Sequence, residues 1–181
     1  MFYSTEFPSP IGEITLACDG NGKNLVGLWI EGQKYHGDTI PEEMAPGDEM
    51  PVFAIVKKWL AQYFEGKKPA VSGLPLAPIG GEFRQGVWNI LREIPYGEVT
   101  TYGNIAREMA KRMNKEAMSS RAVGGAVGRN PISIIIPCHR VVGSNGSLTG
   151  YAGGIKTKIT LLELEGVDMS RLFAPKRGTA L

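Results

Sequence analysis

The stretch Asn-Pro-Ile-Ser-Ile-Ile-Ile-Pro-Cys-His-Arg-Val-Val occupies residues 130–142. Its apolar run at residues 133–136 predicts a buried strand, and Cys138 and His139 follow directly. A thiol becomes a strong nucleophile when it loses its proton, and a nearby imidazole can remove that proton. Neighbouring side chains of a regular strand point to opposite faces, so the two residues can cooperate only if the chain bends. Pro137 favours such a bend because it cannot donate a ladder hydrogen bond.

Short helices are predicted on both sides of this stretch. The apolar spacing predicts helices over residues 83–91 and 102–112, the second capped by Thr100 or Thr101. Ser119 or Ser120 caps a further helix over residues 121–128, which has almost no side-chain bulk. Two short helices joined by a polar turn are typical of a helix-turn-helix, although small residues also serve ordinary close packing of helices. Downstream, a glycine-rich loop at residues 149–154 precedes a helix over residues 155–165.

The first half of the chain follows a different pattern. Alternating residues after Gly12 and the apolar run 25–30 predict a β-hairpin, and a helix is expected from Pro51 to Phe64. Residues 67–81 contain three prolines and three glycines and are the expected linker. The predicted fold class is therefore α/β (α+β), with domains at residues 1–80 and 81–168. Residues 169–181 are expected to form a tail, loosely ordered from Ser170.

Composition and charge narrow the classes of function. No apolar run of the 181 residues is long enough to span a membrane, and the opening residues lack the basic start of a signal peptide, so a cytoplasmic protein is expected. The two cysteines, Cys18 and Cys138, are expected to be free thiols, and no motif predicts a bound metal. Residues 1–81 carry 6 Lys+Arg and 10 Asp+Glu, whereas residues 82–181 carry 14 and 8. The basic second half points to an anionic partner, although an uneven solvated surface would give the same count.

The longer sequence pattern resembles a known family. Residues 130–141, with Arg121 to Ala126 before them and Tyr151 to Gly154 after them, closely resemble the O6-alkylguanine-DNA alkyltransferases. The resemblance covers about residues 83–165. The opening Ser-Pro-Ile-Gly at residues 9–12 also resembles the N-terminal, ribonuclease-H-like sheet domain of that family.

The resemblance implies a role for each matching residue of the active site. Cys138 would accept the alkyl group, His139 would take the thiol proton through a water, and Glu165 would hold His139. Tyr102 would donate a hydrogen bond or a proton to the leaving guanine, and Asn130 would tie the active-site turns together.

Other matching residues are assigned to the substrate base and to DNA. The base pocket would be lined by Tyr151, Ala152, Gly153 and Lys158. The helix-turn-helix and the active-site turn would contact DNA through Arg121, Ala122, Val123, Gly124, Ala126 and Arg140. Arg121 would fill the gap left by the extruded nucleotide, and the small residues of its helix could approach the minor groove without reading the base sequence.

The resemblance also implies the reaction. A protein of this family transfers the alkyl group from O6-alkylguanine in double-stranded DNA to its own cysteine. It must rotate the nucleotide out of the stack, which costs a few kcal/mol. The thioether product is not readily hydrolysed, so each molecule acts once, without a cofactor. A monomer without an obligate protein partner is expected. O4-alkylthymine as a second substrate, the preferred alkyl size and a signalling role are left open.

The sequence departs from the family pattern in places, and two alternative functions remain. Ala152 stands where some relatives carry serine, the loop between residues 112 and 120 is longer than in compact members, and Cys18 is interpreted as a buried structural thiol. A non-enzymatic sensor of alkylated DNA would lack the acceptor cysteine, which is present here. A cysteine hydrolase would need a second catalytic histidine or an oxyanion motif, and the only other histidine, His36, lies in a predicted loop.

Overall fold

The computed structural model describes residues 1–176 and divides the chain into two compact units. Unit 1 comprises residues 1–79 together with residues 131–135. Unit 2 comprises residues 80–130 and the chain from Ile136 onward. No helix among the described residues is both long and apolar enough to cross a membrane.

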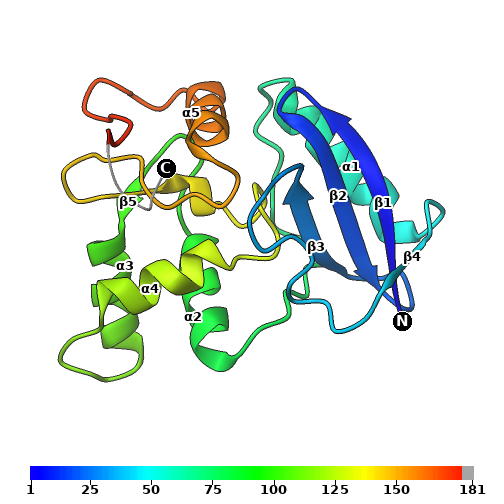
Figure 1. Cartoon of the computed structure of the whole chain (residues 1–181), viewed down its shortest axis with the longest axis horizontal. Helices are drawn as coiled ribbons and strands as arrows, with labels where there is room; N and C mark the ends of the chain where they lie inside the picture. Colours follow the sequence, from blue (N-terminus) through cyan, green and yellow to red (C-terminus); the bar gives the residue numbers. More distant parts are fainter. Residues whose placement is uncertain (177–181) are drawn as a thin grey trace. The chain divides into compact units, whose positions relative to one another are not determined.

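Unit 1 is a four-stranded sheet with one helix (Figure 1). The strands are β1 (Phe2–Ser9), β2 (Gly12–Asp19), β3 (Leu25–Ile30) and β4 (Met44–Pro46). Their order in the sheet is β3-β2-β1-β4, and only the pairing of β4 with β1 is parallel. Helix α1 (Pro51–Phe64) packs on β1 and β2. The predicted hairpin and the helix opened by Pro51 are confirmed, whereas β1 was not predicted.

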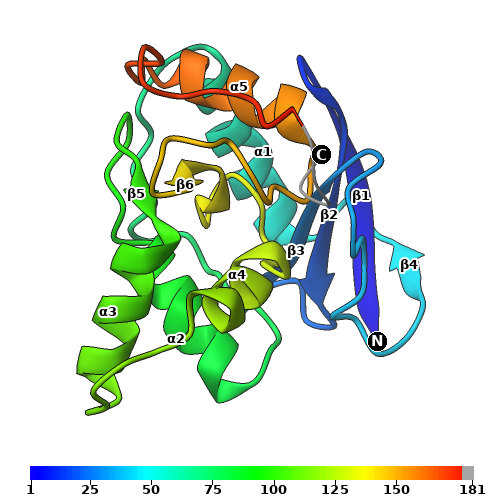
Figure 2. The same ribbon diagram turned by 60° about the vertical axis from the view of Figure 1, so that its left-hand side comes forward.

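Unit 2 contains three mutually packed helices, visible together in Figure 2. They are α2 (Glu82–Leu91), α3 (Tyr102–Arg112) and α4 (Ser120–Gly128). The remaining elements are α5 (Ile155–Leu164), the 3-10 turn η1 (Cys138–Arg140), and the short parallel strands β5 (Thr100–Thr101) and β6 (Val141–Val142).

The predicted caps explain where two of these helices begin. The side chain of Thr101 accepts a hydrogen bond from the backbone N–H of Asn104 at 3.1 Å, and that of Ser119 accepts one from Ala122 at 3.2 Å. Each satisfies a backbone donor that has no partner inside the helix. Helices α3 and α4 follow one another through residues 113–119, as the helix-turn-helix pattern requires.

The apolar run before the cysteine is not the strand that the sequence predicted. The backbone N–H of Leu28 donates to the Pro131 carbonyl at 2.8 Å, and that of Ser133 donates to the Leu28 carbonyl at 3.0 Å. Pairing is limited to one bridge between Leu28 and Ile132, and a turn follows in which Ile134 has φ 69°. A β-branched residue rarely adopts this conformation. An apolar run reports burial, and here the buried segment is a turn rather than a strand.

The expectation of a loosely ordered tail is also wrong for its first part. Phe173 accepts a backbone hydrogen bond from Leu148 at 2.9 Å and donates one to Gly146 at 3.1 Å. Met169 and Leu172 pack on a small core around Leu148 and Leu162. Hydrophobic side chains therefore hold residues 169–173 in place. Residues 177–181 of the predicted tail lie outside the described residues.

A test of the packing in unit 1 uses Gly27. A Cβ atom on Gly27 would lie 2.0 Å from the indole of Trp29, which is buried. We expect Gly27→Ala to lower the free energy of unfolding by about 1–3 kcal/mol, because a well-packed core cannot absorb the methyl group without strain. Denaturant unfolding followed by circular dichroism measures the change.

Gly128→Ala is the matched control, because a Cβ atom there meets nothing within 4 Å. Its expected effect is neutral or stabilising by up to about 1 kcal/mol, since alanine favours a helix. Equal destabilisation by both substitutions would contradict the packing explanation.

Candidate active site

Cys138 begins the 3-10 turn η1, directly after Pro137. The backbone N–H of Cys138 donates to the Ile136 carbonyl at 2.8 Å, and that of Arg140 donates to the Pro137 carbonyl at 3.0 Å. The turn removes the alternation of a strand, so the predicted bend at Pro137 is confirmed. Cys138 keeps 5% of its surface exposed and His139 keeps none.

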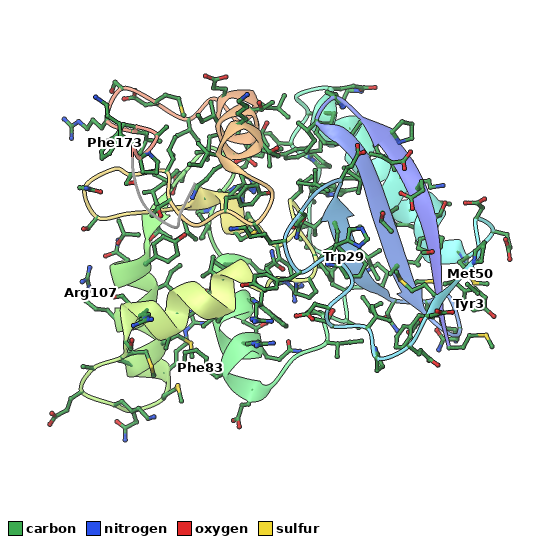
Figure 3. All side chains as sticks on the ribbon, viewed as in Figure 1. Tyr3, Trp29, Met50, Phe83, Arg107 and Phe173 are labelled. Carbon is green, nitrogen blue, oxygen red and sulfur yellow. The ribbon has the colours of Figure 1, made fainter. Side chains whose placement is uncertain are left out.

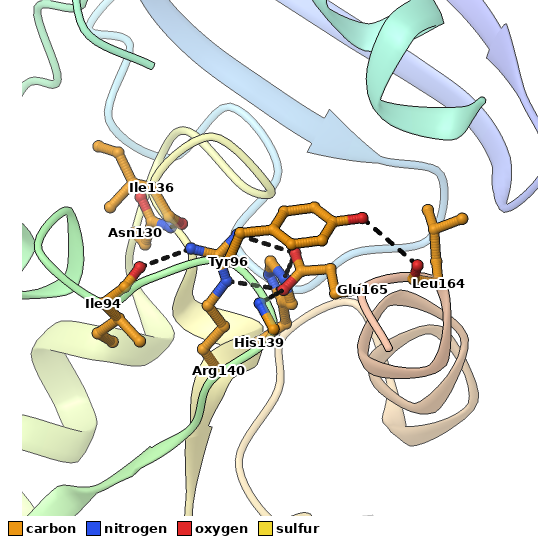
Figure 4. A network of polar contacts seen from close by, with 9 residues as sticks. Ile94, Tyr96, Asn130, Ile136, His139, Arg140, Leu164 and Glu165 are labelled. Carbon is orange, nitrogen blue, oxygen red and sulfur yellow. Dashed lines mark hydrogen bonds and ion pairs between the residues drawn. The ribbon is translucent and has the colours of Figure 1, made fainter. Parts of the chain in front are cut away.

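His139 and Glu165 form a buried pair that joins the turn to the end of α5 (Figure 4). Their atoms Nε2 and Oε1 lie 2.7 Å apart. An ionised carboxylate can only accept hydrogen bonds, so the proton of a neutral His139 ring belongs on Nε2. Nδ1 then carries the free lone pair, and this atom is buried without a hydrogen-bond partner among the described residues. The arrangement leaves one basic nitrogen available in the residue next to Cys138.

Arg140 also donates to the Glu165 carboxylate. Its Nε donates to Oε2 of Glu165 at 2.8 Å, and another guanidinium nitrogen donates to Oε1 at 2.9 Å. A third hydrogen bond, of 2.7 Å, goes to the Ile94 carbonyl, and the guanidinium lies 5.7 Å from the centre of the Tyr96 ring. The prediction that Arg140 contacts DNA is therefore wrong, because its guanidinium is buried and holds Glu165.

These contacts determine the protonation states of the site. Although burial alone would raise it, hydrogen bonds from His139 and Arg140 hold the pKa of Glu165 far below its usual range. Burial lowers the pKa of His139, an effect that the carboxylate only partly opposes. Burial also raises the pKa of the Cys138 thiol, against the lowering effects of Asn130 and Lys158. At neutral pH the resting site therefore holds a carboxylate, a neutral imidazole and a thiol.

Asn130 closes the segment that leads to the cysteine. Its amide Nδ2 donates to the Ile136 carbonyl at 2.7 Å. Residues 131–135 between these two positions belong to unit 1, so the Asn130 side chain joins the points where the chain leaves unit 2 and returns to it. The same side chain acts to lower the pKa of the Cys138 thiol, against the larger opposing effect of burial.

Lys158 and Tyr102 meet at a single carbonyl group. The Tyr102 hydroxyl donates to the Thr149 carbonyl at 2.9 Å, and the buried Lys158 ammonium donates to it at 3.1 Å as well as to Val141. Burial lowers the pKa of Lys158 to about 8 and raises that of Tyr102 above its usual range. Gly150 follows with φ 81°, and a Cβ atom there would lie 2.6 Å from the Tyr102 hydroxyl oxygen. Only glycine permits this approach.

The predicted base-pocket residues follow this carbonyl along the chain. Tyr151 is buried, and its hydroxyl has no hydrogen-bond partner among the described residues. Its ring lies edge-on to that of His139, with centroids 6.5 Å apart. Ala152 and Gly153 are partly exposed. Tyr151 therefore lies beside the imidazole, and the two small residues are accessible from solvent.

Helix α4 does not present all of its predicted DNA contacts. Arg121 and Ala122 are exposed, and Gly124 is partly exposed. Val123 and Ala126 are buried, and the Ala126 carbonyl accepts a hydrogen bond from the Trp88 indole at 2.9 Å. The prediction that Val123 and Ala126 contact DNA is therefore wrong, because they attach α4 to the rest of unit 2. Gly125 is exposed and was not assigned a role.

Sequence reasoning missed two groups that complete the site. The partnership of Arg140 with Glu165 spans 25 positions of the chain, and only the turn at residues 138–140 brings it about. The Thr149 carbonyl belongs to the backbone, so no side-chain motif could reveal it. Arg140 itself could have indicated the pairing, because an arginine among buried residues requires an acidic partner.

The alternative of a cysteine hydrolase gains no support. His36 belongs to unit 1, where its ring lies 5.2 Å from that of Trp29 and its Nε2 is 3.2 Å from the Thr15 hydroxyl. Cys138 belongs to unit 2 and already has His139 as its neighbour. Within residues 1–176, no three His, Cys, Asp or Glu side chains are grouped so that they could hold a metal ion.

Two family models match the chain. Residues 1–78 match the ribonuclease-like domain of 6-O-methylguanine DNA methyltransferase, and residues 82–167 match its DNA-binding domain. A methylated-DNA–protein-cysteine methyltransferase of Haemophilus influenzae is 43% identical over 171 residues, covering 91% of this chain and 87% of that protein. One of Methanosarcina acetivorans is 46% identical over 166 residues, covering 92% and 99%.

Solved structures are also similar to this chain. The crystal structure of the Mycobacterium tuberculosis O6-methylguanine methyltransferase is similar with a TM-score of 0.76 and 40% identity, covering 98% of this chain and 97% of that one. A structure of the M. tuberculosis protein in complex with DNA has a TM-score of 0.74 and 39% identity, covering 94% of each chain. The mixed α/β fold, the two matching models and these relatives show that the chain belongs to the 6-O-methylguanine DNA methyltransferase family.

Proposed function

We propose that this protein repairs O6-alkylguanine in double-stranded DNA by moving the alkyl group onto Cys138 in a single turnover. The observation that carries the proposal is the buried His139–Glu165 pair next to Cys138, with His139 Nδ1 unpartnered. The names of the relatives and the DNA complex of the M. tuberculosis protein support it.

In the proposed reaction, His139 Nδ1 takes the thiol proton of Cys138 through a water. The sulfur then attacks the alkyl carbon, a C–S bond forms, and the bond from that carbon to O6 breaks. The bonding electrons pass to the guanine, which finally takes up the proton that the thiol released. Because burial raises the pKa of Cys138, the thiol is the resting state, and the thiolate of the proposed reaction forms during the transfer.

Tyr102 and the adjacent loop serve the leaving base. Burial keeps the Tyr102 hydroxyl protonated, so it can donate a hydrogen bond to the guanine as negative charge develops. To do so the hydroxyl turns from the Thr149 carbonyl, which Lys158 continues to hold. Tyr151, Ala152 and Gly153 line the pocket of the extruded base.

Unit 2 carries the DNA contacts, with Arg121 filling the gap in the stack and Ala122, Gly124 and Gly125 facing the minor groove. In domain terms, residues 1–80 form the sheet domain and residues 81–168 form the DNA-binding and alkyl-acceptor domain, with residues 131–135 passing through the first. We place the protein in the cytoplasm, because a reducing compartment keeps Cys138 as a thiol. We also propose that it acts as a monomer.

The acceptor assignment predicts a change in mass. Incubation with a duplex containing O6-methylguanine adds one methylene unit to the protein, and peptide mapping locates it on Cys138. We expect Cys138→Ser to remain unmodified, because an alcohol is a far weaker nucleophile than a thiolate. Cys18→Ser is the control, because Cys18 lies in β2 of unit 1, and it should react like the parent protein. Full activity of Cys138→Ser would reject the proposal.

The role of Glu165 predicts effects on rate and stability. Glu165→Gln leaves Arg140 buried without its ionic partner and removes the group that orients His139. We expect alkyl transfer to slow by about 100-fold and the free energy of unfolding to fall by on the order of 3–5 kcal/mol. Single-turnover assays and denaturant unfolding measure the two effects. Glu163→Gln, on the exposed side of the same helix, should change neither.

The lowered pKa of Glu165 predicts that the stability of the fold depends on pH. Because the folded protein holds the pKa of Glu165 far below its unfolded value, ionised Glu165 stabilises the fold above the unfolded pKa. That contribution is lost as the pH falls below about 5, where the unfolded chain takes up the proton first. Unfolding measured from pH 7 to pH 3 should show a shallower loss of stability in Glu165→Gln than in the parent. Equal slopes would contradict this assignment.

The role of Arg121 predicts a difference between substrates. Arg121→Ala should slow repair of a duplex by roughly tenfold or more, because the cost of unstacking is a few kcal/mol and the arginine no longer offsets part of it. Transfer from free O6-benzylguanine should change much less, since a free base needs no extrusion. Equal loss with both substrates would refute the role in extrusion.

A further inference from the structure

A basic hollow lies between α3 and the loop of residues 113–119, and the family resemblance assigned it no role. Its volume is about 390 Å³. Small residues of α3, namely Gly103, Ala106 and Ala110, line it from one side. Residues 115–118 and Ser120, at the start of α4, line it from the other.

The residues that line this hollow carry a net positive charge. Arg107, Lys111 and Lys115 line it, and Glu116 is the one acid that does so. All four side chains are exposed, and Arg107 is labelled on α3 in Figure 3. Within the described part of the chain, neither lysine ammonium group has an ion-pair or hydrogen-bond partner, whereas the nearby Arg112 is paired with both Glu93 and Glu108. The lysines therefore face the hollow with their charge uncompensated.

The position of the hollow connects it with the proposed DNA contacts. It lies at the turn of the helix-turn-helix, and the residue that follows its lining residue Ser120 is Arg121. The three cations come from the last two turns of α3 and from the long loop, whose length the resemblance did not explain. An anion bound there would lie beside the first turn of α4, where the helix dipole also favours negative charge.

We propose that this hollow holds a backbone phosphate of the DNA strand that flanks the site of repair. The inference rests on the proposed function, because it needs duplex DNA on α4. Phosphate contacts set the position and orientation of a protein on a duplex without reading its sequence. A repair protein that must act in any sequence context needs contacts of this kind. The long loop would thus extend the DNA contact beyond α4.

The test is the salt dependence of binding to an undamaged duplex. Each lost phosphate contact reduces the slope of log affinity against log salt concentration by about 0.9. We therefore expect the double variant Lys111→Gln, Lys115→Gln, which loses the contact with this one phosphate, to have a slope smaller by about 0.9 than that of the parent. Fluorescence anisotropy with a labelled duplex measures it. Glu116→Gln should instead bind DNA more tightly, because the opposing charge is removed.

The matched control is the double variant Lys23→Gln, Lys34→Gln, which removes two exposed lysines of unit 1 and should keep the parent slope. Thermal unfolding establishes that all variants remain folded, and Lys111→Arg with Lys115→Arg should restore the parent slope. An unchanged slope in the glutamine double variant overturns the proposal, as does an equal decrease in the control.

A second arm separates a DNA phosphate from a free anion. Inorganic phosphate is titrated into the parent and the glutamine variant at constant ionic strength, and the melting temperature is followed. Saturable stabilisation of the parent alone, together with an unchanged DNA slope, would mean that the hollow takes a free anion, which overturns the proposal. If the parent protein accepts the alkyl group but the glutamine variant keeps the parent slope, the phosphate site in the hollow is refuted and the proposed function is not. A parent that accepts none refutes the proposed function itself.

Discussion

The Glu165 carboxylate is the constraint on which the chemistry of unit 2 depends. One oxygen accepts from both His139 and Arg140, and the other accepts from Arg140 at 2.8 Å and from the backbone N–H of Gly97 at 3.4 Å. A buried charge is tolerated only when it is paired and hydrogen-bonded, and here two consecutive residues of a tight turn donate to one carboxylate. The position of the turn and the tautomer of His139 therefore follow from the same interaction.

This constraint also explains why a buried cysteine can be the proposed acceptor. The surroundings of Cys138 favour the neutral thiol, which protects it from adventitious reaction in the absence of a substrate. The means of deprotonation are nonetheless in place, because the His139 ring is neutral and has one nitrogen free. In the proposed mechanism the sulfur is therefore neutral at rest and loses its proton to the imidazole during the transfer.

Much of the local structure could be predicted from the sequence, because caps, glycines and prolines act on neighbouring residues. The caps at Thr101 and Ser119 and the bend at Pro137 are examples. The predictions that were wrong concern contacts between residues far apart in the chain. Residues 133–136 are buried as an apolar run suggests, but their turn follows from pairing with Leu28, far away in the chain. The family resemblance implied a DNA contact for Arg140, whereas its pairing with Glu165 becomes visible only in the fold.

The passage of residues 131–135 through unit 1 has a consequence for dissecting the protein. The two units are not consecutive on the chain, so a single cut near residue 80 does not separate them. A fragment that starts there would still carry Ile132 and Ser133 but would lose Leu28, to which both are attached. The peptide immediately before Cys138 would be released from its anchor, and proteases would gain access to the chain beside this cysteine.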